Sequence, residues 1–322
     1  MTPWFFVLEC VAIAVLIGAC ASIASIMLWP ALGRVLPSAA WRADAAFVLG
    51  TMPAVLSVIG TAAAAAPPIS SALGYGVDHC PTHGHHLHLC LVHSSASLAP
   101  AGALLSCWLL LRTLSLARRL VATSRDLGAL QRLGERSSKS LVICVPGSPR
   151  ICHAVGFVRG RILLSTSLAR ALPPHHLACA LAHERAHLRR RDPLTSLLLS
   201  VAGLVQLPGV SGALARAFRV AAEEACDDFA AREVGDPVRV AEALVAVAEL
   251  QRAQPGFDEA VHAFGEHALE RRIRRLLHGR GRAGRARGLA LAMLASGACA
   301  LLATRHTSAL HHLVETALKS PF

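Results

Sequence analysis

The chain alternates between long apolar runs and one extended polar segment. Four runs come close to the about 20 apolar residues that a helix needs to cross a hydrocarbon core: residues 11–29, 45–66, 94–111 and 288–304. The first run follows no basic residue and is too long for the apolar part of a signal peptide, so we expect it to be retained. The pattern predicts a mainly α, polytopic membrane protein with about four transmembrane helices.

The residues at the ends of two of these runs indicate where the helices leave the membrane. The second run contains Pro53 and is followed by Pro67 and Pro68. We expect this proline pair to end the helix, because proline lacks the backbone N–H and clashes with the preceding turn. The third run ends at Arg112, whose long side chain can extend to the membrane interface.

A fifth apolar run, residues 193–215, is uncharged but is interrupted by Gly203, Pro208 and Gly212. Such breaks predict a bend or a turn instead of one straight helix. If the run crossed the membrane, the basic stretch before Gly288 would lie on the opposite side from the rest of the polar segment. Lys and Arg concentrate on the cytoplasmic side. We therefore expect a re-entrant or membrane-abutting hairpin rather than a fifth span.

The net charge of +12 comes from the polar segment. Residues 112–287 hold 28 of the 32 Lys and Arg and 16 of the 20 acidic residues, whereas residues 67–93 hold no Lys or Arg. This asymmetry predicts a cytoplasmic domain at 112–287, between three spans within residues 1–111 and a fourth at 288–304. The N-terminus, the loop before the third span and the tail at 305–322 would then lie outside the cytoplasm.

The basic balance does not indicate a nucleic-acid-binding protein. Only 4% of the residues are aromatic, and we find no interleaving of aromatic with basic residues of the kind that single-strand binders use.

Within the polar segment, residues 140–147 and 160–166 read as short strands, because they combine β-branched residues with flanking Gly or Pro. Helical patterns follow at 214–234 and 238–254. The predicted domain is thus α+β.

The sequence LAHERAHLRRRD holds the pattern H-E-x-x-H at His183, Glu184 and His187. Pro173 and Pro174 predict a helix start upstream, and residues four apart lie on one helix face. The two histidines can therefore bind one Zn²⁺. Glu184 lies about 100° round the helix, where it can take a proton from the attacking water instead of binding the metal. His175 and His176 are read as helix residues, not as ligands.

A catalytic zinc ion needs a third protein ligand and an open position. The second helix contains the sequence AAEEACDDFAARE, in which Glu223 and Asp227 are four residues apart. We assign Glu223 to the metal and Asp227 to the orientation of an imidazole, with Asp192 in the same supporting role. Glu224 competes for the ligand position. Without the upstream motif, the acidic run would be read as a solvated helix face.

These residues resemble the membrane metallopeptidases of the BlaR/MecR type. That family has H-E-x-x-H-x-x-x-x-D followed by a helix with E-x-x-C-D, here His183 to Asp192 and then Glu223, Cys226 and Asp227. The similarity covers about residues 96–305. It implies a gluzincin-like fold, one Zn²⁺ ion and endopeptidase activity. The usual cytoplasmic targets of the family are the sensor itself and a transcriptional repressor.

The chain departs from the β-lactam sensors of that family. Those sensors carry a penicillin-binding domain with a Ser-x-x-Lys nucleophile after the last span. Only 18 residues follow Thr304, and neither Lys139 nor Lys319 has a serine three positions before it. We therefore expect no covalent β-lactam sensing by this chain.

The loop before the third span, within residues 76–93, is rich in metal-binding residue types. It holds six histidines and two cysteines: His79, Cys80, His83, His85, His86, His88, Cys90 and His93. At this density imidazole and thiolate groups can bind Zn²⁺, Cu or Ni. Alternatively, Cys80 and Cys90 form a disulfide in an oxidising compartment, or the loop is polar without a ligand.

The sequence thus predicts a regulatory zinc endopeptidase of a bacterial-type inner membrane, which cleaves itself or a cytoplasmic repressor. The predicted partners are a protein substrate and the lipid bilayer. A substrate would pair as an added strand with residues 160–166. Two alternatives stay open at this point. One is a membrane quality-control protease like HtpX or the CAAX-prenyl protease, and the other is a non-proteolytic metal-binding membrane sensor.

Overall fold

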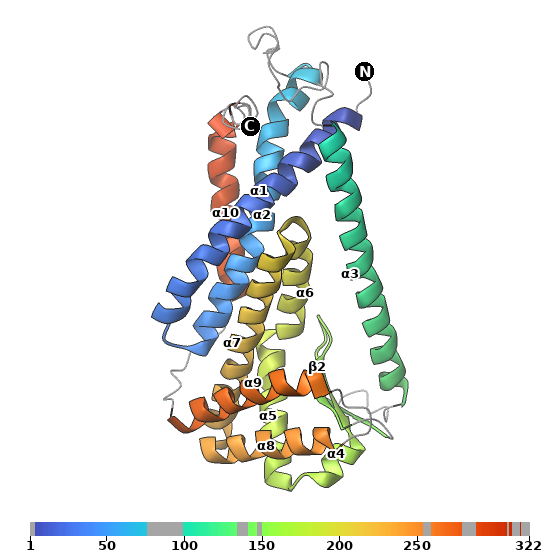
Figure 1. Ribbon diagram of the computed structural model, residues 1–322, viewed down its shortest axis with the longest axis vertical. Helices are drawn as coiled ribbons and strands as arrows, with labels where there is room; N and C mark the ends of the chain where they lie inside the picture. The colour runs from blue at the N-terminus through green and yellow to red at the C-terminus, as the bar shows by residue number, and fades with distance from the viewer. Residues whose placement is uncertain are drawn as a thin grey trace.

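The structure is a computed structural model of the chain and describes residues 4–75, 99–133, 141–146, 150–253, 259–278, 288–307, 309–310 and 316. Most of these residues are helical, and a small sheet lies between helices α3 and α4 in the chain. Figure 1 shows an elongated molecule in which the long apolar helices lie at the end that carries both termini. The helices and strands with the polar sequence lie toward the opposite end.

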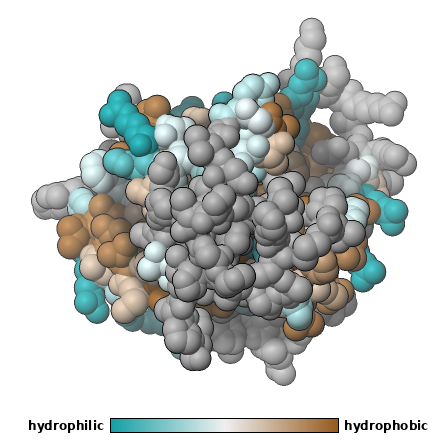
Figure 2. Space-filling view, turned by 90° about the horizontal axis from the view of Figure 1, so that it is seen from above, coloured by the Kyte–Doolittle hydropathy of each residue, from teal (hydrophilic) through white to brown (hydrophobic). Residues whose placement is uncertain are grey.

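Three helices among the described residues are long and apolar enough to cross a membrane: α1 (Trp4–Val35), α2 (Ala39–Ala72) and the first part of α3 (Ala99–Leu133). They expose large apolar side chains such as Met27, Val58 and Leu104. Hydrophobic residues also lie on the flanks of the molecule when it is viewed from the end with the termini (Figure 2). These features are those of a membrane-associated protein.

The first three predicted spans are thus present as helices, although each helix is longer than its apolar run. The fourth predicted span corresponds to α10 (Gly288–Arg305), which packs along α2 but is shorter than the three long helices. Its crossing of the membrane stays a prediction.

The expectation that Pro67 and Pro68 end the second span was wrong. Both lie inside α2, which continues to Ala72. Proline is tolerated inside apolar helices that neighbouring helices hold in place, and the turn before this pair packs against α1 through Ala64 and Ala65. The helix ends at Ala72, four residues after Pro68, and the N–H groups of Gly74 and Tyr75 bond back to its last turn.

The fifth apolar run forms a helical hairpin. Its first arm is α6 (Asp192–Ala202), its turn contains the short helix η2 (Gly203–Val205), and its second arm is the start of α7 (Pro208–Val234). The chain turns back at the glycine and proline that interrupt the run, and α7 begins before the expected residue 214 because Pro208 occupies its first turn. In Figure 1 the turn of the hairpin lies among the apolar helices.

All three long helices contact the turn of this hairpin. Arg112 of α3 donates hydrogen bonds to the carbonyls of Leu204 and Gln206 at 2.8 and 2.7 Å. The Gln206 side chain in turn donates to the carbonyl of Gly50 in α2 at 2.7 Å. In α1, a Cβ on Gly18 would lie 2.4 Å from the Val205 carbonyl oxygen. Close backbone contacts and hydrogen bonds from Arg112 and Gln206 therefore hold the turn against the three helices.

The sheet has the strand order β1-β3-β2, with β1 (Val142–Val145) parallel and β2 (Cys152–Val155) antiparallel to β3 (Arg161–Ser165). The predicted strands at 140–147 and 160–166 contain β1 and β3, whereas β2 was not predicted. Because β3 lies in the centre of the sheet, its two edges are occupied. The expectation that a substrate pairs with residues 160–166 was therefore wrong, and β2 is the edge strand that packs against α5.

The helices of the polar segment pack around buried clusters of small and aliphatic residues. After α4 (Thr166–Ala171) comes α5 (Pro174–Arg190), which packs against α7 and α8 (Pro237–Arg252). One apolar cluster joins α5 and α8 through Cys179, Ala182 and Val240. The last helix of the segment, α9 (Glu259–His278), crosses α7 and α8 (Figure 1). This packing fixes the faces of α5 and α7 that form the site.

Candidate metal centre

The H-E-x-x-H residues lie on α5, whose boundaries follow from its sequence. Pro174 occupies the first turn, where its missing N–H has no intrahelical partner to lose. The helix ends at Arg191, which adopts a left-handed conformation with φ of 57° and ends the helix as such residues commonly do. Between these ends His183 and Glu184 are buried, each 8% exposed.

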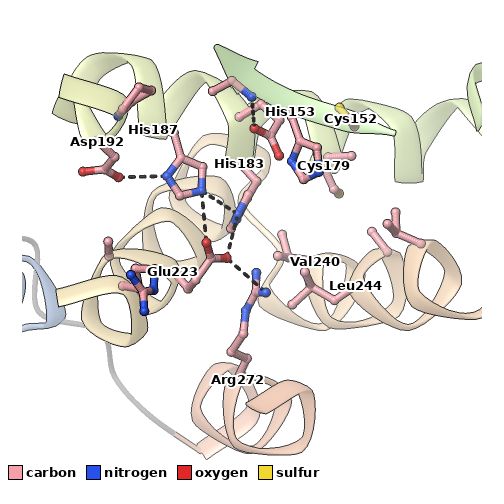
Figure 3. A pocket seen from close by; sticks show the side chains of 18 of the residues that line it. Cys152, His153, Cys179, His183, His187, Asp192, Glu223, Val240, Leu244 and Arg272 are labelled. Carbon is pink, nitrogen blue, oxygen red and sulfur yellow. Dashed lines mark hydrogen bonds and ion pairs between the residues drawn. The ribbon is translucent and has the colours of Figure 1, made fainter. Parts of the chain in front are cut away.

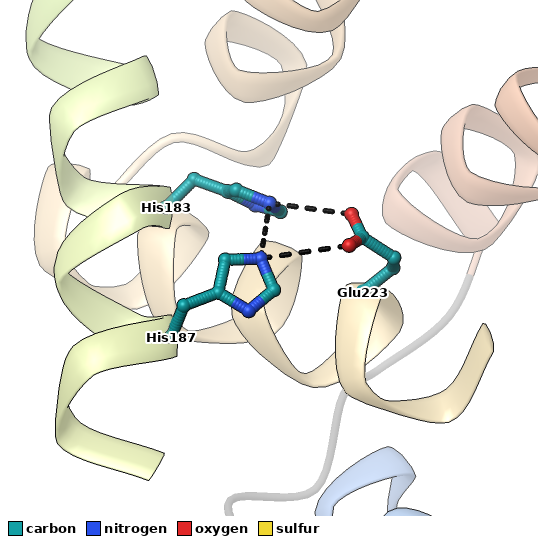
Figure 4. Close-up of side chains that lie close together, drawn as sticks. All are labelled: His183, His187 and Glu223. Atoms are coloured by element: carbon teal, nitrogen blue, oxygen red, sulfur yellow. Dashed lines mark hydrogen bonds and ion pairs between the residues drawn. The ribbon is translucent and has the colours of Figure 1, made fainter. Parts of the chain in front are cut away.

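Helix α7 brings Glu223 to the two histidines. The Nε2 atoms of His183 and His187 lie 3.2 Å apart. The two carboxylate oxygens of Glu223 lie 3.4 Å from His183 Nε2 and 3.5 Å from His187 Nε2. Figure 4 shows the three side chains pointing toward one another. Of the candidate ligands, these three therefore converge from two helices.

The spacing of these donor atoms fits a tetrahedral zinc site. Two ligands bound to one Zn²⁺ ion at about 2.0–2.1 Å with a tetrahedral angle lie about 3.3 Å apart. The imidazole nitrogens are 3.2 Å apart, and each lies 3.4 or 3.5 Å from a different oxygen of the Glu223 carboxylate, so all three separations are close to this value. Two imidazoles and one carboxylate also form the donor set of a common catalytic zinc site with an open fourth position. The residues present fit the ion that the sequence predicts.

Each histidine has a carboxylate at its other ring nitrogen. Asp227, 2% exposed, lies with Oδ1 3.0 Å from His183 Nδ1, and Asp192 Oδ2 lies 2.8 Å from His187 Nδ1. Such contacts set the tautomer that leaves Nε2 free to bind a metal. The sequence assigned supporting roles to both residues, and each lies at the second ring nitrogen of one histidine. The roles themselves stay predictions.

The charges around His183 favour a cation in this position. Burial alone would lower the pKa of His183, but contacts with Asp227 and Glu223 outweigh it and raise the pKa to about 10. Burial works against ionised Glu223, yet His183 and Arg272 lower its pKa to about 2. The pKa of Asp227 is lowered for the same reason. Without a metal, the carboxylates thus hold a proton on His183.

Glu184 faces the exposed edge of the sheet. Its Oε2 accepts a hydrogen bond from the Ala154 N–H of β2 at 2.6 Å. In an antiparallel pair, backbone groups alternate between the partner strand and the other edge, so this N–H lies on the side of β2 that faces away from β3. The residue assigned to proton transfer is therefore next to the backbone edge of a strand.

A cavity of about 420 Å³ contains the site. One wall holds the histidines, Glu223 and Arg272, and the other holds apolar side chains of α5 and α8, including Val240 and Leu244 (Figure 3). Pockets with a few polar groups converging beside an apolar wall are typical of substrate sites. The arrangement can bind an apolar side chain next to the metal ligands.

The structure places two residues near Glu223 that the sequence left open or did not identify, Glu224 and Arg272. Glu224, the competing ligand, points away from the histidines: its carboxylate accepts a hydrogen bond from Arg42 at 2.8 Å and pairs with Arg271 at 3.4 Å. Arg272 was not predicted to belong to the site. It lies in the sequence LERRIRRLL, and no spacing rule connects this segment to an acidic helix about 45 residues earlier.

The histidine- and cysteine-rich loop, with His79 to His93, lies outside the described residues. Its metal-binding and disulfide alternatives stay predictions. The described cysteines are free thiols. One of them, Cys226, is fully buried with its Sγ 3.4 Å from His187 Nδ1, so it packs directly behind the predicted metal ligand.

The comparison with known proteins agrees with this geometry. A family model described as BlaR1 peptidase M56 matches residues 96–276, which include α3, the sheet and the helices that carry the site. No curated protein and no solved structure matches the chain significantly. Because the family match covers more than half of the chain, the protein belongs to the BlaR1-type peptidases of family M56, which are membrane metallopeptidases.

Proposed function

We propose that the protein is a zinc-dependent endopeptidase of regulatory type, with Zn²⁺ held by His183, His187 and Glu223. The convergence of these three side chains at separations of 3.2–3.5 Å carries the proposal. Their donor set and spacing are those of a catalytic zinc site with one open position. Asp227 and Asp192 would hold the two imidazoles in the tautomer that binds the metal.

The bound metal would lower the pKa of a water molecule and polarise the substrate carbonyl. Glu184 would take the proton from the attacking water and deliver it to the leaving amide nitrogen. The Glu184 side chain is buried, and its carboxylate accepts a hydrogen bond from the Ala154 N–H at 2.6 Å. Its low exposure keeps bulk water from competing for that proton.

A substrate would bind in extended form along β2, antiparallel or parallel to residues Cys152–Val155. Support comes from the position of β2 beside α5 and from the Ala154 N–H, which faces Glu184. An added strand gains main-chain hydrogen bonds and presents alternate side chains to pockets. The apolar wall with Val240 and Leu244 would receive one of those side chains.

The proposed substrate is a cytoplasmic transcriptional repressor or the chain itself. The family resemblance supports this target, and the charge distribution supports a cytoplasmic position of residues 112–287. A quality-control protease would instead cleave many misfolded membrane proteins. A small winged-helix repressor encoded beside this gene would favour the regulatory role.

The test is co-expression of the full chain with the repressor encoded nearest to its gene, in a membrane host. We expect the wild-type protein to cleave the repressor or itself, and Glu184→Gln to abolish cleavage while zinc stays bound. Glu242→Gln is the matched control, because Glu242 lies on α8 with 61% of its side chain exposed and outside the cavity lining. Undiminished cleavage by Glu184→Gln would contradict the mechanism.

A further inference from the structure

Helix α9 contributes a row of arginines to the acidic run of α7. Arg272 and Arg275 lie on the face of α9 that contacts α7. Arg275 donates to the Asp228 carboxylate at 2.5 Å and to the Glu224 carbonyl at 2.9 Å. These contacts fasten α9 to α7 but touch none of the residues assigned to the metal.

Arg272 makes a different set of contacts from the same helix. Its Nε and Nη2 atoms donate to the two oxygens of Asp227, both at 2.7 Å. Its Nη1 atom lies 3.1 Å from Glu223 Oε2. One planar guanidinium thus binds both carboxylates that contact His183, and Figure 3 shows it pointing toward Glu223 in the cavity.

The geometry of the guanidinium is suited to fixing two side chains at once. Arginine presents five N–H donors in a rigid plane, so paired contacts to a carboxylate restrict its rotation as well as its position. The side chain of Arg272 is 18% exposed and that of Asp227 is 2% exposed. Contacts at this depth are screened little by solvent.

We propose that Arg272 is a positioning residue of the metal centre: it holds Glu223 in the orientation that binds the metal and Asp227 in the orientation that supports His183. The proposal rests on the metal site proposed above. It assigns to α9 a role beyond packing, because the helix supplies the group that aligns a ligand on α7.

The sign of the effect on metal affinity separates this role from simple electrostatics. A positive charge 3.1 Å from a metal ligand repels a cation, so its removal would strengthen zinc binding if charge alone mattered. A positioning residue has the opposite effect. Loss of such outer contacts typically weakens metal affinity or activity by about 10–100-fold.

The test measures zinc affinity of the purified full-length protein in detergent by competition with a chromophoric chelator. We expect Arg272→Ala to weaken zinc binding by about 10–100-fold. Arg272→Lys should show a smaller loss than Arg272→Ala, because its ammonium group can keep one carboxylate contact, but not full affinity, because it cannot bind both carboxylates. Arg275→Ala is the matched control: it should lower thermal stability, because it weakens the contact between α9 and α7, but leave zinc affinity within about threefold of wild type.

The absorption spectrum of a bound metal gives a second test, because a change in helix packing alone would leave the spectrum unaltered. In the Co²⁺-substituted protein, we expect Arg272→Ala to shift the visible absorption bands of the metal and Arg275→Ala to leave them unchanged. Unchanged or tighter zinc binding in Arg272→Ala, or equal losses in the two variants, would overturn the positioning role. If Arg272→Ala does not fold, Arg272→Lys carries the comparison. Failure of the wild-type protein to bind Co²⁺ or Zn²⁺ would instead contradict the proposed metal site.

Discussion

Asp192 offers a sharp test of how the second histidine is held. Asp192→Asn removes the charge of the carboxylate while keeping its size. In the wild-type protein, Asp192 Oδ2 lies 2.8 Å from His187 Nδ1, and the same carboxylate lies 3.2 Å from Arg190 Nε. Asp192 is 6% exposed, so solvent does not replace what the substitution removes.

Two magnitudes follow from these contacts. A weakened partner of a metal-binding imidazole typically costs about 10–100-fold in metal affinity, or about 1.4–2.7 kcal/mol. In addition, Arg190 loses a charged hydrogen-bond acceptor, which corresponds to about 1.5–3 kcal/mol of folding stability. We therefore expect Asp192→Asn to weaken zinc binding by about 10–100-fold and to lower the unfolding temperature of the metal-free protein.

The assay is chelator competition combined with thermal unfolding in detergent. Asp236→Asn is the matched control, because it also neutralises one carboxylate. Asp236 caps α8 by accepting hydrogen bonds from Val238 N–H and Arg239 N–H, and asparagine caps about as well as aspartate. Zinc affinity of Asp192→Asn equal to that of Asp236→Asn would refute the role given to Asp192.

Three further predictions concern the metal ligands and the hairpin. Zinc affinity should fall about tenfold per pH unit from about pH 9 to about pH 7. The pKa of His183 is raised to about 10, so zinc must displace a proton from this histidine at lower pH. Zinc titrations at several pH values measure this, and an affinity that does not change with pH would contradict it. In the metal-free protein, protonated His183 contributes to folding stability. This contribution is complete below the pKa of the histidine in the unfolded chain and is lost as the pH rises through about 10. Thermal unfolding at several pH values measures it. Gly18→Ala should destabilise the protein by about 1–3 kcal/mol, since its Cβ would meet the Val205 carbonyl oxygen at 2.4 Å, whereas Gly297→Ala, with no atom within 4 Å of its Cβ, should change stability by less than about 1 kcal/mol.

The parts of the fold that follow local rules could be predicted from the sequence. The apolar runs predicted the three long helices, and prolines predicted where α5 starts. The i, i+4 spacing of His183 and His187 predicted a shared helix face. The family resemblance is confirmed by the match to residues 96–276.

The remaining features depend on contacts between distant segments. Strand β2 is four residues long and carries a histidine and a cysteine, so its sequence has no clear alternation to identify it. Its place at the edge of the sheet depends on pairing with β3. The continuation of α2 through Pro67 and Pro68 accompanies its packing against α1 through Ala64 and Ala65, a contact between segments that helix propensity does not register.

The same reason explains why Arg272 was missed. Its segment, LERRIRRLL, resembles a polar, solvated helix face, and only the crossing of α9 over α7 brings one of its arginines to Asp227 and Glu223. The sequence assigned Glu223 to the metal but left Glu224 as a competitor. Packing in space separates the two, because Arg42 of α2 binds Glu224 and Glu223 faces the histidines. A single sequence does not encode these pairings as a local pattern.

X-ray absorption spectroscopy of the purified zinc-loaded protein tests the central claim most directly. We predict one zinc ion per chain with two imidazole nitrogens and one carboxylate in its first shell. The ion should be lost in His183→Ala and retained when His85 is replaced by alanine. A first shell with sulfur ligands, or zinc that survives His183→Ala but not His85→Ala, would contradict a metal centre built from α5 and α7.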